Sequence, residues 1–168
     1  GSAFGTGSHP TTRLCLEALE ASPPAGLRVA DLGCGSGVLG LAALGLGARE
    51  VLAADTDSLA VRATTDNAAI NDLAPSALRV RQGSVEVLQD LLSGEPADLL
   101  LCNILAPVIE ALAPQFEGVL RASGRGLLSG LLVEQAPRLT EVLQGLGWRV
   151  KPLAEQGRWG LLEIHRQA

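Results

Sequence analysis

The sequence predicts an α/β domain built on a mostly parallel seven-stranded sheet that ends in an antiparallel hairpin. Short apolar runs alternate along the chain with segments of helical periodicity, as expected when helices join parallel strands. The run 98–102 is almost entirely apolar, which is typical of a strand covered on both faces. The last two apolar runs have no helix between them, so we expect them to pair in the antiparallel sense.

Each expected strand is a short apolar run next to turn residues, and the seven runs are 28–32, 51–55, 78–80, 98–102, 126–131, 148–150 and 159–165. Helices are expected before the Pro23-Pro24 turn and over 38–46, 57–71 and 135–146, with another that begins at Pro107. Asp57 suits the N-cap of its helix, and Pro107 and Pro137 suit the first turns of theirs.

Composition limits the class of protein. The chain has 168 residues, of which 47% are hydrophobic and 18% are charged, so we expect residues 1–168 to form a single globular domain. No apolar run is long enough to cross a membrane, and no signal peptide is recognisable. Three cysteines without Cys/His spacing predict neither disulfides nor a metal site, and they favour the cytoplasm. A net charge of −5 argues against direct nucleic-acid binding.

A glycine-rich turn follows the first expected strand and reads Asp31-Leu32-Gly33-Cys34-Gly35-Ser36-Gly37. Alternating glycines allow positive φ and a close approach of the backbone to a ligand. The helix that follows offers free N–H groups at its N-terminus. Asp55, at the end of the second expected strand, can accept hydrogen bonds from both hydroxyls of a ribose. The pattern therefore favours a ligand that contains a nucleoside.

Two ligand classes fit this arrangement. Residues 35–40 match the GxGxxG pattern of dinucleotide-binding turns, and Asp55 lies 20 residues after Gly35, which would suit NAD. The glycine run, however, begins earlier, as DxGxGxG from Asp31 to Gly37. An ordinary tight turn in a glycine-rich chain is the third interpretation. The DxGxGxG pattern resembles the first motif of the Rossmann-like, class I methyltransferases that use S-adenosylmethionine.

Two further segments narrow the resemblance. The first expected helix is preceded by Phe4-Gly5-Thr6-Gly7-Ser8-His9-Pro10-Thr11-Thr12, and the fourth expected strand is followed by Asn103-Ile104-Leu105. With the glycine turn and Asp55, these segments resemble the catalytic domain of the ribosomal protein L11 methyltransferase family over essentially the whole chain. The resemblance implies a protein N-methyltransferase that transfers methyl groups from S-adenosylmethionine to lysine or other amino groups of ribosomal protein L11. That family also carries an N-terminal substrate-recognition domain, which we expect to be absent here.

The resemblance also assigns cofactor contacts. Residues 4–12 would form a flexible segment that covers S-adenosylmethionine, and the implied contacts are Thr6, Thr11, Thr12, Gly33, Gly35, Gly37, Asp55, Thr56, Ser84 and Asn103. Thr11 and Thr12 would equally suit a simple helix start, and His9 would suit either a base or a loop-ordering residue. Ser84 stands near the place where many methyltransferases carry an acid that binds the adenine amine, and Glu86 is out of register with it. Cys34 and Cys102 suit small core residues.

The catalytic residues that the resemblance implies are Asn103, Ile104 and Leu105. They occupy the place where amine-directed methyltransferases carry Asn or Asp followed by Pro-Pro-aromatic. An amide oxygen and a backbone carbonyl can accept the N–H groups of an amine and aim its lone pair at a sulfonium methyl group for in-line displacement. We therefore expect Asn103 to position the amine and not to accept its proton.

Other substrates remain open at this stage. Enzymes that methylate exocyclic amines of nucleic acids normally stack the flipped base on an aromatic side chain after the Asn. This chain has Ile104 and Leu105 there and no Tyr, which favours an aliphatic amine on a protein. The alternatives are a lysine of another protein, a nucleic-acid amine, or a cofactor-binding module without activity of its own.

Overall fold

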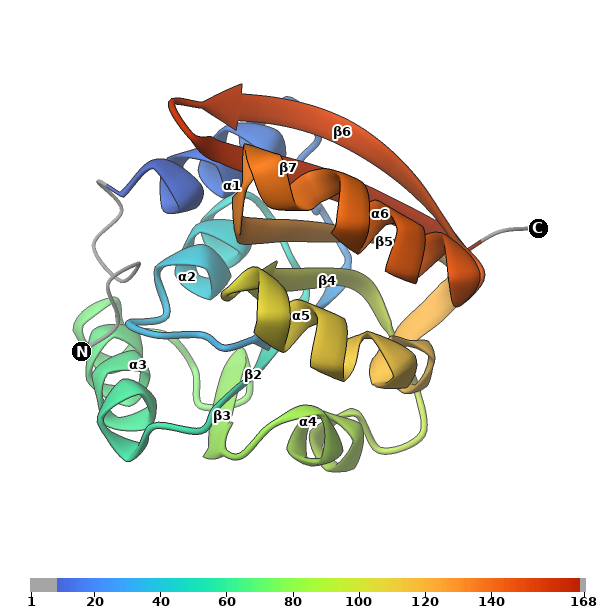
Figure 1. Cartoon of the computed structure of the whole chain (residues 1–168). Coiled ribbons are helices and arrows are strands. Elements are labelled where there is room, and N and C mark those ends of the chain that lie inside the picture. The colour runs from blue at the N-terminus through green and yellow to red at the C-terminus, as the bar shows by residue number, and fades with distance from the viewer. Residues whose placement is uncertain (1–8, 167–168) are drawn as a thin grey trace.

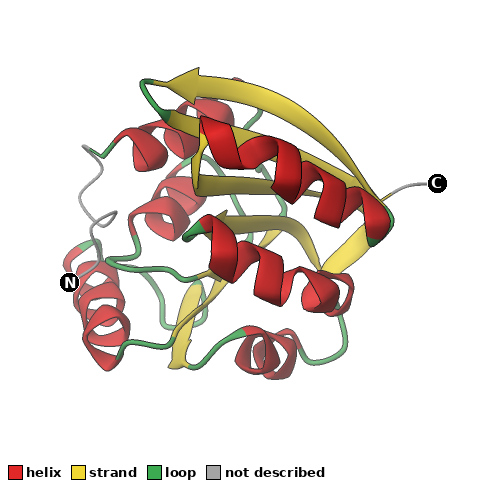
Figure 2. Ribbon diagram, in the orientation of Figure 1, coloured by secondary structure: helices red, strands yellow, loops and turns green. Residues whose placement is uncertain are grey.

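The computed structural model describes residues 9–166 (Figures 1 and 2). The α-helices are α1 (Pro10–Ala21), α2 (Val38–Gly45), α3 (Ser58–Ile70), α4 (Val85–Leu92), α5 (Ala106–Leu112) and α6 (Ala136–Gly145), and η1 (Ala113–Gly118) and η2 (Val133–Gln135) are 3-10 turns. The strands are β1 (Arg28–Leu32), β2 (Glu50–Asp55), β3 (Leu78–Gln82), β4 (Ala97–Asn103), β5 (Leu120–Leu132), β6 (Trp148–Gln156) and β7 (Trp159–Arg166).

The seven strands form one sheet in the order β3-β2-β1-β4-β5-β7-β6. The first five pair in parallel, whereas β7 runs antiparallel to both β5 and β6. The predicted fold class is therefore confirmed. The usual dinucleotide-binding order is 3-2-1-4-5-6, without an antiparallel strand inserted beside the fifth.

Helices cover both faces of the sheet (Figure 1). One core cluster holds side chains from α1 and α2 against β1, β2 and β4, including Leu19, Val29 and Leu101. The other holds side chains from α4, α5, η1 and α6, including Leu88, Ile109 and Phe116. Because both faces are buried, the central strands are mostly apolar, which explains the run that predicted β4.

The expected helix signals are confirmed at three helices. The Asp57 carboxylate accepts a hydrogen bond from Leu59 N at 2.9 Å and caps α3. Pro107 and Pro137 both lie in the first turns of their helices, α5 and α6. Each helix begins within one residue of the position that these signals predict.

The structure contains one α-helix that was not predicted, and several strands are longer than predicted. Helix α4 was not predicted, although its buried residues Val85, Leu88, Leu91 and Leu92 follow a helical period. The expected strands 78–80, 126–131 and 148–150 extend to β3, β5 and β6, and most of the added residues are exposed or half-buried.

Strand β5 contains a bulge that bears on the site. Its pairing with β7 runs from Leu128↔Leu162 to Leu131↔Gly160, so β5 holds one residue more than β7 between these pairs. Gly130 lies in this stretch with a φ of +88°. Bulges of this kind bend a strand and redirect side chains, and they are common beside active sites.

Candidate active site

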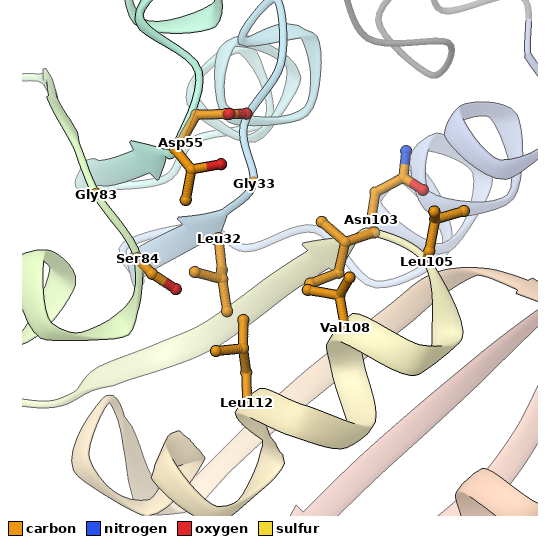
Figure 3. A pocket seen from close by; sticks show the side chains of 11 residues that line it. Leu32, Gly33, Asp55, Gly83, Ser84, Asn103, Leu105, Val108 and Leu112 are labelled. Carbon is orange, nitrogen blue, oxygen red and sulfur yellow. The ribbon is translucent and has the colours of Figure 1, made fainter.

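A pocket of about 380 Å³ lies at the carboxyl ends of the parallel strands (Figure 3). Its lining residues are Leu32, Gly33, Asp55, Thr56, Gly83, Ser84, Asn103, Ile104, Leu105, Val108 and Leu112. The volume lies within the range of small-molecule sites, and the position is where ligands bind in open α/β sheets. The sheet therefore gathers the ends of four strands around one cavity.

The glycine turn between β1 and α2 forms one side of this pocket. Gly33, Gly35 and Gly37 all have positive φ. Helix α3 fixes the turn by two hydrogen bonds. Thr64 Oγ1 donates to the Gly35 carbonyl at 3.0 Å, and Asn67 Nδ2 donates to the Ser36 carbonyl at 2.8 Å. These two helix residues were not singled out in the sequence.

Asp55 is fixed at the end of β2 by backbone donors. One carboxylate oxygen accepts a hydrogen bond from Gly35 N at 2.9 Å, and the other accepts one from Asp57 N at 2.9 Å. A carboxylate has about four lone-pair positions, so each oxygen retains capacity for a further donor. The side chain thus presents a preoriented acceptor at the pocket wall.

The end of β3 contributes Gly83 and Ser84 to the same pocket. The Glu86 carboxylate accepts a hydrogen bond from Ser84 N at 3.1 Å, and Glu86 itself is exposed and does not line the pocket. An acid is therefore present near this strand end, but its carboxylate binds the backbone at the start of α4 and it is not among the residues that line the pocket. In this respect the chain differs from the many methyltransferases in which an acid near this strand end binds the adenine amine.

Asn103 lies at the opposite end of the pocket with 8% of its surface exposed. Its Oδ1 accepts a hydrogen bond from Ser129 Oγ at 3.0 Å, and its Nδ2 donates to Thr12 Oγ1 at 3.4 Å. Ser129 Oγ in turn lies 3.0 Å from Cys15 Sγ. The amide is therefore held by groups from α1 and β5.

Helix α1 begins beside Asn103. His9 is its N-cap, and His9 Nδ1 accepts a hydrogen bond from Thr11 N at 3.2 Å and lies 2.8 Å from Thr11 Oγ1. The His9 ring also meets the Trp159 ring edge-on, with centroids 5.2 Å apart. These contacts support the loop-ordering interpretation of His9. Thr11 and Thr12 are both fully buried in the first turn.

An apolar wall closes the pocket. Ile104, Leu105, Val108 and Leu112 line it, and the Val108 and Leu112 side chains of α5 point toward the end of β1 (Figure 3). Leu105 is 53% exposed and Val108 is 43% exposed, so the wall continues to the molecular surface. Such a wall can pack against the face of an adenine ring or against the aliphatic stem of a lysine.

The predicted site residues separate into three groups. The pocket brings together Gly33, Asp55, Thr56, Ser84, Asn103, Ile104 and Leu105. Thr11, Thr12, Gly35 and Gly37 lie outside its lining, and Thr6 lies outside the described residues. Sequence reasoning missed Leu32, Gly83, Val108, Leu112 and Ser129. Ser129 had a signal, because it is the polar residue of the otherwise apolar run 126–131.

Buried ionisable groups lie behind the pocket. Burial, and then the charge of Asp55, raises the pKa of Asp31 to about 7. Burial also raises the pKa of the Cys15 and Cys34 thiols to about 12, and it raises the pKa of Cys102 further still. The thiols are therefore protonated at neutral pH and are not nucleophiles, in agreement with core roles for Cys34 and Cys102.

Within residues 9–166, no group of three or more His, Cys, Asp or Glu side chains could hold a metal ion. In the same residues, no helix combines the length and apolar character required to cross a membrane.

Comparison with solved structures defines the class of protein. A ribosomal protein L11 methylase from Lactobacillus delbrueckii subsp. bulgaricus is 32% identical and superposes with a TM-score of 0.82 over 94% of this chain and 79% of its own. A TehB-like S-adenosylmethionine-dependent methyltransferase from Corynebacterium glutamicum, 17% identical, shares the fold with a TM-score of 0.70 over 91% of this chain and 87% of its own. The fold is that of the Rossmann-like, S-adenosylmethionine-dependent methyltransferases.

The family follows from sequence comparison. A family model described as ribosomal protein L11 methyltransferase matches residues 1–167, and the chain belongs to that family. Curated relatives with this name are 72% identical in Parasynechococcus marenigrum and 68% identical in Prochlorococcus marinus, each over 99% of this chain. The chain spans 58% and 56% of the length of these two relatives.

Proposed function

We propose that this chain is the catalytic domain of an enzyme that transfers methyl groups from S-adenosylmethionine to amino groups of ribosomal protein L11. Membership of the family and the pocket at the carboxyl ends of β1, β2 and β4 support this proposal. Because the relatives are nearly twice as long, recognition of ribosomal protein L11 is expected to involve sequence outside these 168 residues. We expect the enzyme to act in the cytoplasm, where ribosomal proteins are made.

The observation that carries the cofactor proposal is the anchored carboxylate of Asp55. Its two backbone donors hold both oxygens at the pocket wall, where they can accept hydrogen bonds from the two ribose hydroxyls. Gly33, without a side chain, would let the nucleoside approach the backbone of β1, and Thr56 and Ser84 would lie on the adenine side. Gly35 and Gly37 would shape the turn, and Thr6, Thr11 and Thr12 would lie near the methionine carboxylate.

When bound, the cofactor supplies an electrophilic methyl group on a sulfonium. The chain's own residues then position the amine. Asn103 Oδ1 accepts one hydrogen bond from Ser129 and has a second lone pair for an N–H of the amine. Ile104 and Leu105 continue the pocket wall from Asn103. Holding the amine nitrogen in line with the methyl group makes the bimolecular reaction effectively unimolecular. This positioning accounts for much of the rate enhancement.

The amine has to be neutral to attack. A lysine has a reference pKa of about 10.4, so deprotonation at pH 7 costs about 4–5 kcal/mol in water. Removal from water and a neighbouring sulfonium both favour the neutral form. Among the described residues that line the pocket, Asp55 is the one carboxylate, and the proposal assigns it to the ribose hydroxyls. We infer that the proton leaves to solvent before the amine docks.

Calorimetric titration with S-adenosylmethionine, and in parallel with NADH, tests the cofactor. Saturable binding of S-adenosylmethionine that weakens at least tenfold in Asp55→Ala is the expected result. Preferential binding of NADH would overturn the proposal in favour of the dinucleotide interpretation of residues 35–40. Mass spectrometry of ribosomal protein L11 after incubation with the full-length enzyme tests the substrate, with gains of one methyl mass per transfer expected on lysine or α-amino groups.

A further inference from the structure

We infer that the Ser129–Gly130 dipeptide of β5 positions Asn103 and Ile104 for methyl transfer, with Ser129 setting the orientation of the Asn103 amide. This inference rests on the proposed function of Asn103 as the residue that positions the amine. It assigns a role to two residues that do not line the pocket.

The first step is the direction of the hydrogen bonds. Ser129 has a single hydroxyl hydrogen, and it is directed at Asn103 Oδ1, which can only accept. The 3.0 Å contact between Ser129 Oγ and Cys15 Sγ therefore has the thiol as its donor. Burial keeps the pKa of Cys15 at about 12, so this donor is present across the physiological pH range. The donors run in one direction, from thiol to hydroxyl to amide oxygen.

The second step concerns the other end of the amide. Asn103 Nδ2 donates to Thr12 Oγ1 at 3.4 Å, so the oxygen and nitrogen of the amide meet different partners. Ser129, Cys15 and Thr12 are fully buried, so solvent does not compete for these bonds. Buried hydrogen bonds in a chain reinforce one another and are costly to leave unmade. The amide is therefore held on both sides by buried partners.

The third step is the strand geometry that makes the contact possible. Ser129 lies directly opposite Asn103 in the parallel ladder of β4 and β5. The β5 bulge follows at once, and Leu128 and Leu131 on its two sides both pack in the same core cluster, although regular alternation would place them on opposite faces. Ser129 lies on the face of Leu127 and Cys15, and the extra residue after it shifts the alternation so that Leu131 returns to the face of Leu128.

Gly130 completes the arrangement. A methyl group on Gly130 would lie 2.7 Å from the Ile104 carbonyl carbon and 2.9 Å from Ile104 N, and it would overlap the carbonyl oxygen. With glycine at this position, the Ile104 peptide packs directly against β5. The dipeptide therefore supports the side chain of Asn103 and the backbone of its neighbour at the same time.

Side-chain amide NMR of the 168-residue chain tests the orientation without any turnover. The Asn103 amide protons, assigned by their loss in Asn103→Asp, are expected to be well dispersed and slow to exchange. Ser129→Ala should shift and broaden them, and Ser129→Thr, which restores the hydroxyl, should return them toward their wild-type positions. Cys102→Ala is the matched control, because it removes a buried thiol next to Asn103 without removing a donor of the chain. An unchanged Asn103 signal in Ser129→Ala would overturn the inference.

Kinetics with ribosomal protein L11 and the full-length enzyme supply the functional test. In Ser129→Ala we expect kcat to fall roughly 10- to 100-fold while the Kd for S-adenosylmethionine stays within about threefold, since only the amine's acceptor moves. An equal loss of kcat in Cys102→Ala, or an unchanged kcat in Ser129→Ala, would contradict the positioning role. If the wild-type enzyme does not methylate the substrate, the proposed function fails while the NMR result still decides the orientation. Should Ser129→Ala not fold, Ser129→Cys retains the size and a weaker donor, and it should give intermediate shifts.

Discussion

The buried carboxyl of Asp31, at the end of β1, is influenced by the charge of Asp55 at the end of the neighbouring β2. Burial is the larger cause and the charge of Asp55 the second, and together they raise the pKa of Asp31 from 3.8 to about 7. Among the described residues, Asp31 Oδ2 has no hydrogen-bond partner. The carboxyl behind the glycine turn therefore carries a proton well above the pH at which a free aspartate ionises.

This raised pKa predicts how stability depends on pH. Between pH 4 and pH 7 the unfolded chain loses the Asp31 proton while the folded chain retains it, so the free energy of unfolding falls as pH rises, by at most about 4 kcal/mol. Asp31→Asn removes this titration. Urea unfolding at pH 5 and pH 8 should show a smaller loss of stability in Asp31→Asn than in the wild type. Asp57→Asn, an exposed change that keeps an N-cap, should retain the wild-type loss. Equal losses in all three proteins would contradict the prediction.

Arg28 ties β1 to the loop after α4. Its guanidinium donates to the Leu92 carbonyl at 2.8 Å, to the Glu95 carbonyl and to the Glu50 carboxylate at 3.1 Å, and Arg28 is buried. Arg28→Ala leaves these acceptors without their donor, and we expect a loss of about 2–4 kcal/mol in the free energy of unfolding. Chemical denaturation measures it. Arg158→Ala, which removes an exposed ion pair with Glu134, should cost less than about 1 kcal/mol. Similar losses for both variants would show that the Arg28 bonds add little.

Local signals were enough to predict the architecture. The apolar runs, the Asp57 cap and the proline positions located every strand and most helices, because these features act within a few residues. Helix α4 was missed although the spacing of its buried residues is helical. The bulge in β5 was not predictable from β5 alone, since it depends on the partner strand β7.

The site was predictable where residues follow strand ends. Gly33, Asp55 and Asn103 lie at the carboxyl ends of adjacent strands, and the topology brings them together. The contacts of Thr64 and Ser129 were not predictable, because they join residues 29 and 26 positions apart through side-chain orientation. Every cofactor contact remains a prediction, both for the residues that line the pocket, such as Gly33 and Asp55, and for Thr6, Thr11, Thr12, Gly35 and Gly37.

Asn103→Ala separates positioning from proton transfer. We expect kcat for methylation of ribosomal protein L11 to fall by roughly 100-fold, because the amine loses an oriented acceptor. The rate should still rise with pH toward the pKa of the substrate amine in both proteins, since the Asn103 amide does not titrate. A pH–rate profile of each enzyme checks this. Loss of an ionisation in the variant that the wild type shows would mean that Asn103 takes part in proton transfer.

Gly33 offers a matched test of the contact between the glycine turn and the wall of the pocket. Gly33 and Gly26 have nearly equal φ values, +74° and +73°, so an alanine at either position carries a similar backbone strain of about 1 kcal/mol. A methyl group at Gly33 would overlap the Ile104 side chain, whereas one at Gly26 would meet nothing within 4 Å. Gly33→Ala should therefore weaken S-adenosylmethionine binding by roughly tenfold or more in calorimetry, because Ile104 has to move within the pocket, and Gly26→Ala should leave the Kd nearly unchanged. Equal affinities of the two variants would mean that the pocket does not depend on the packing of Gly33 against Ile104.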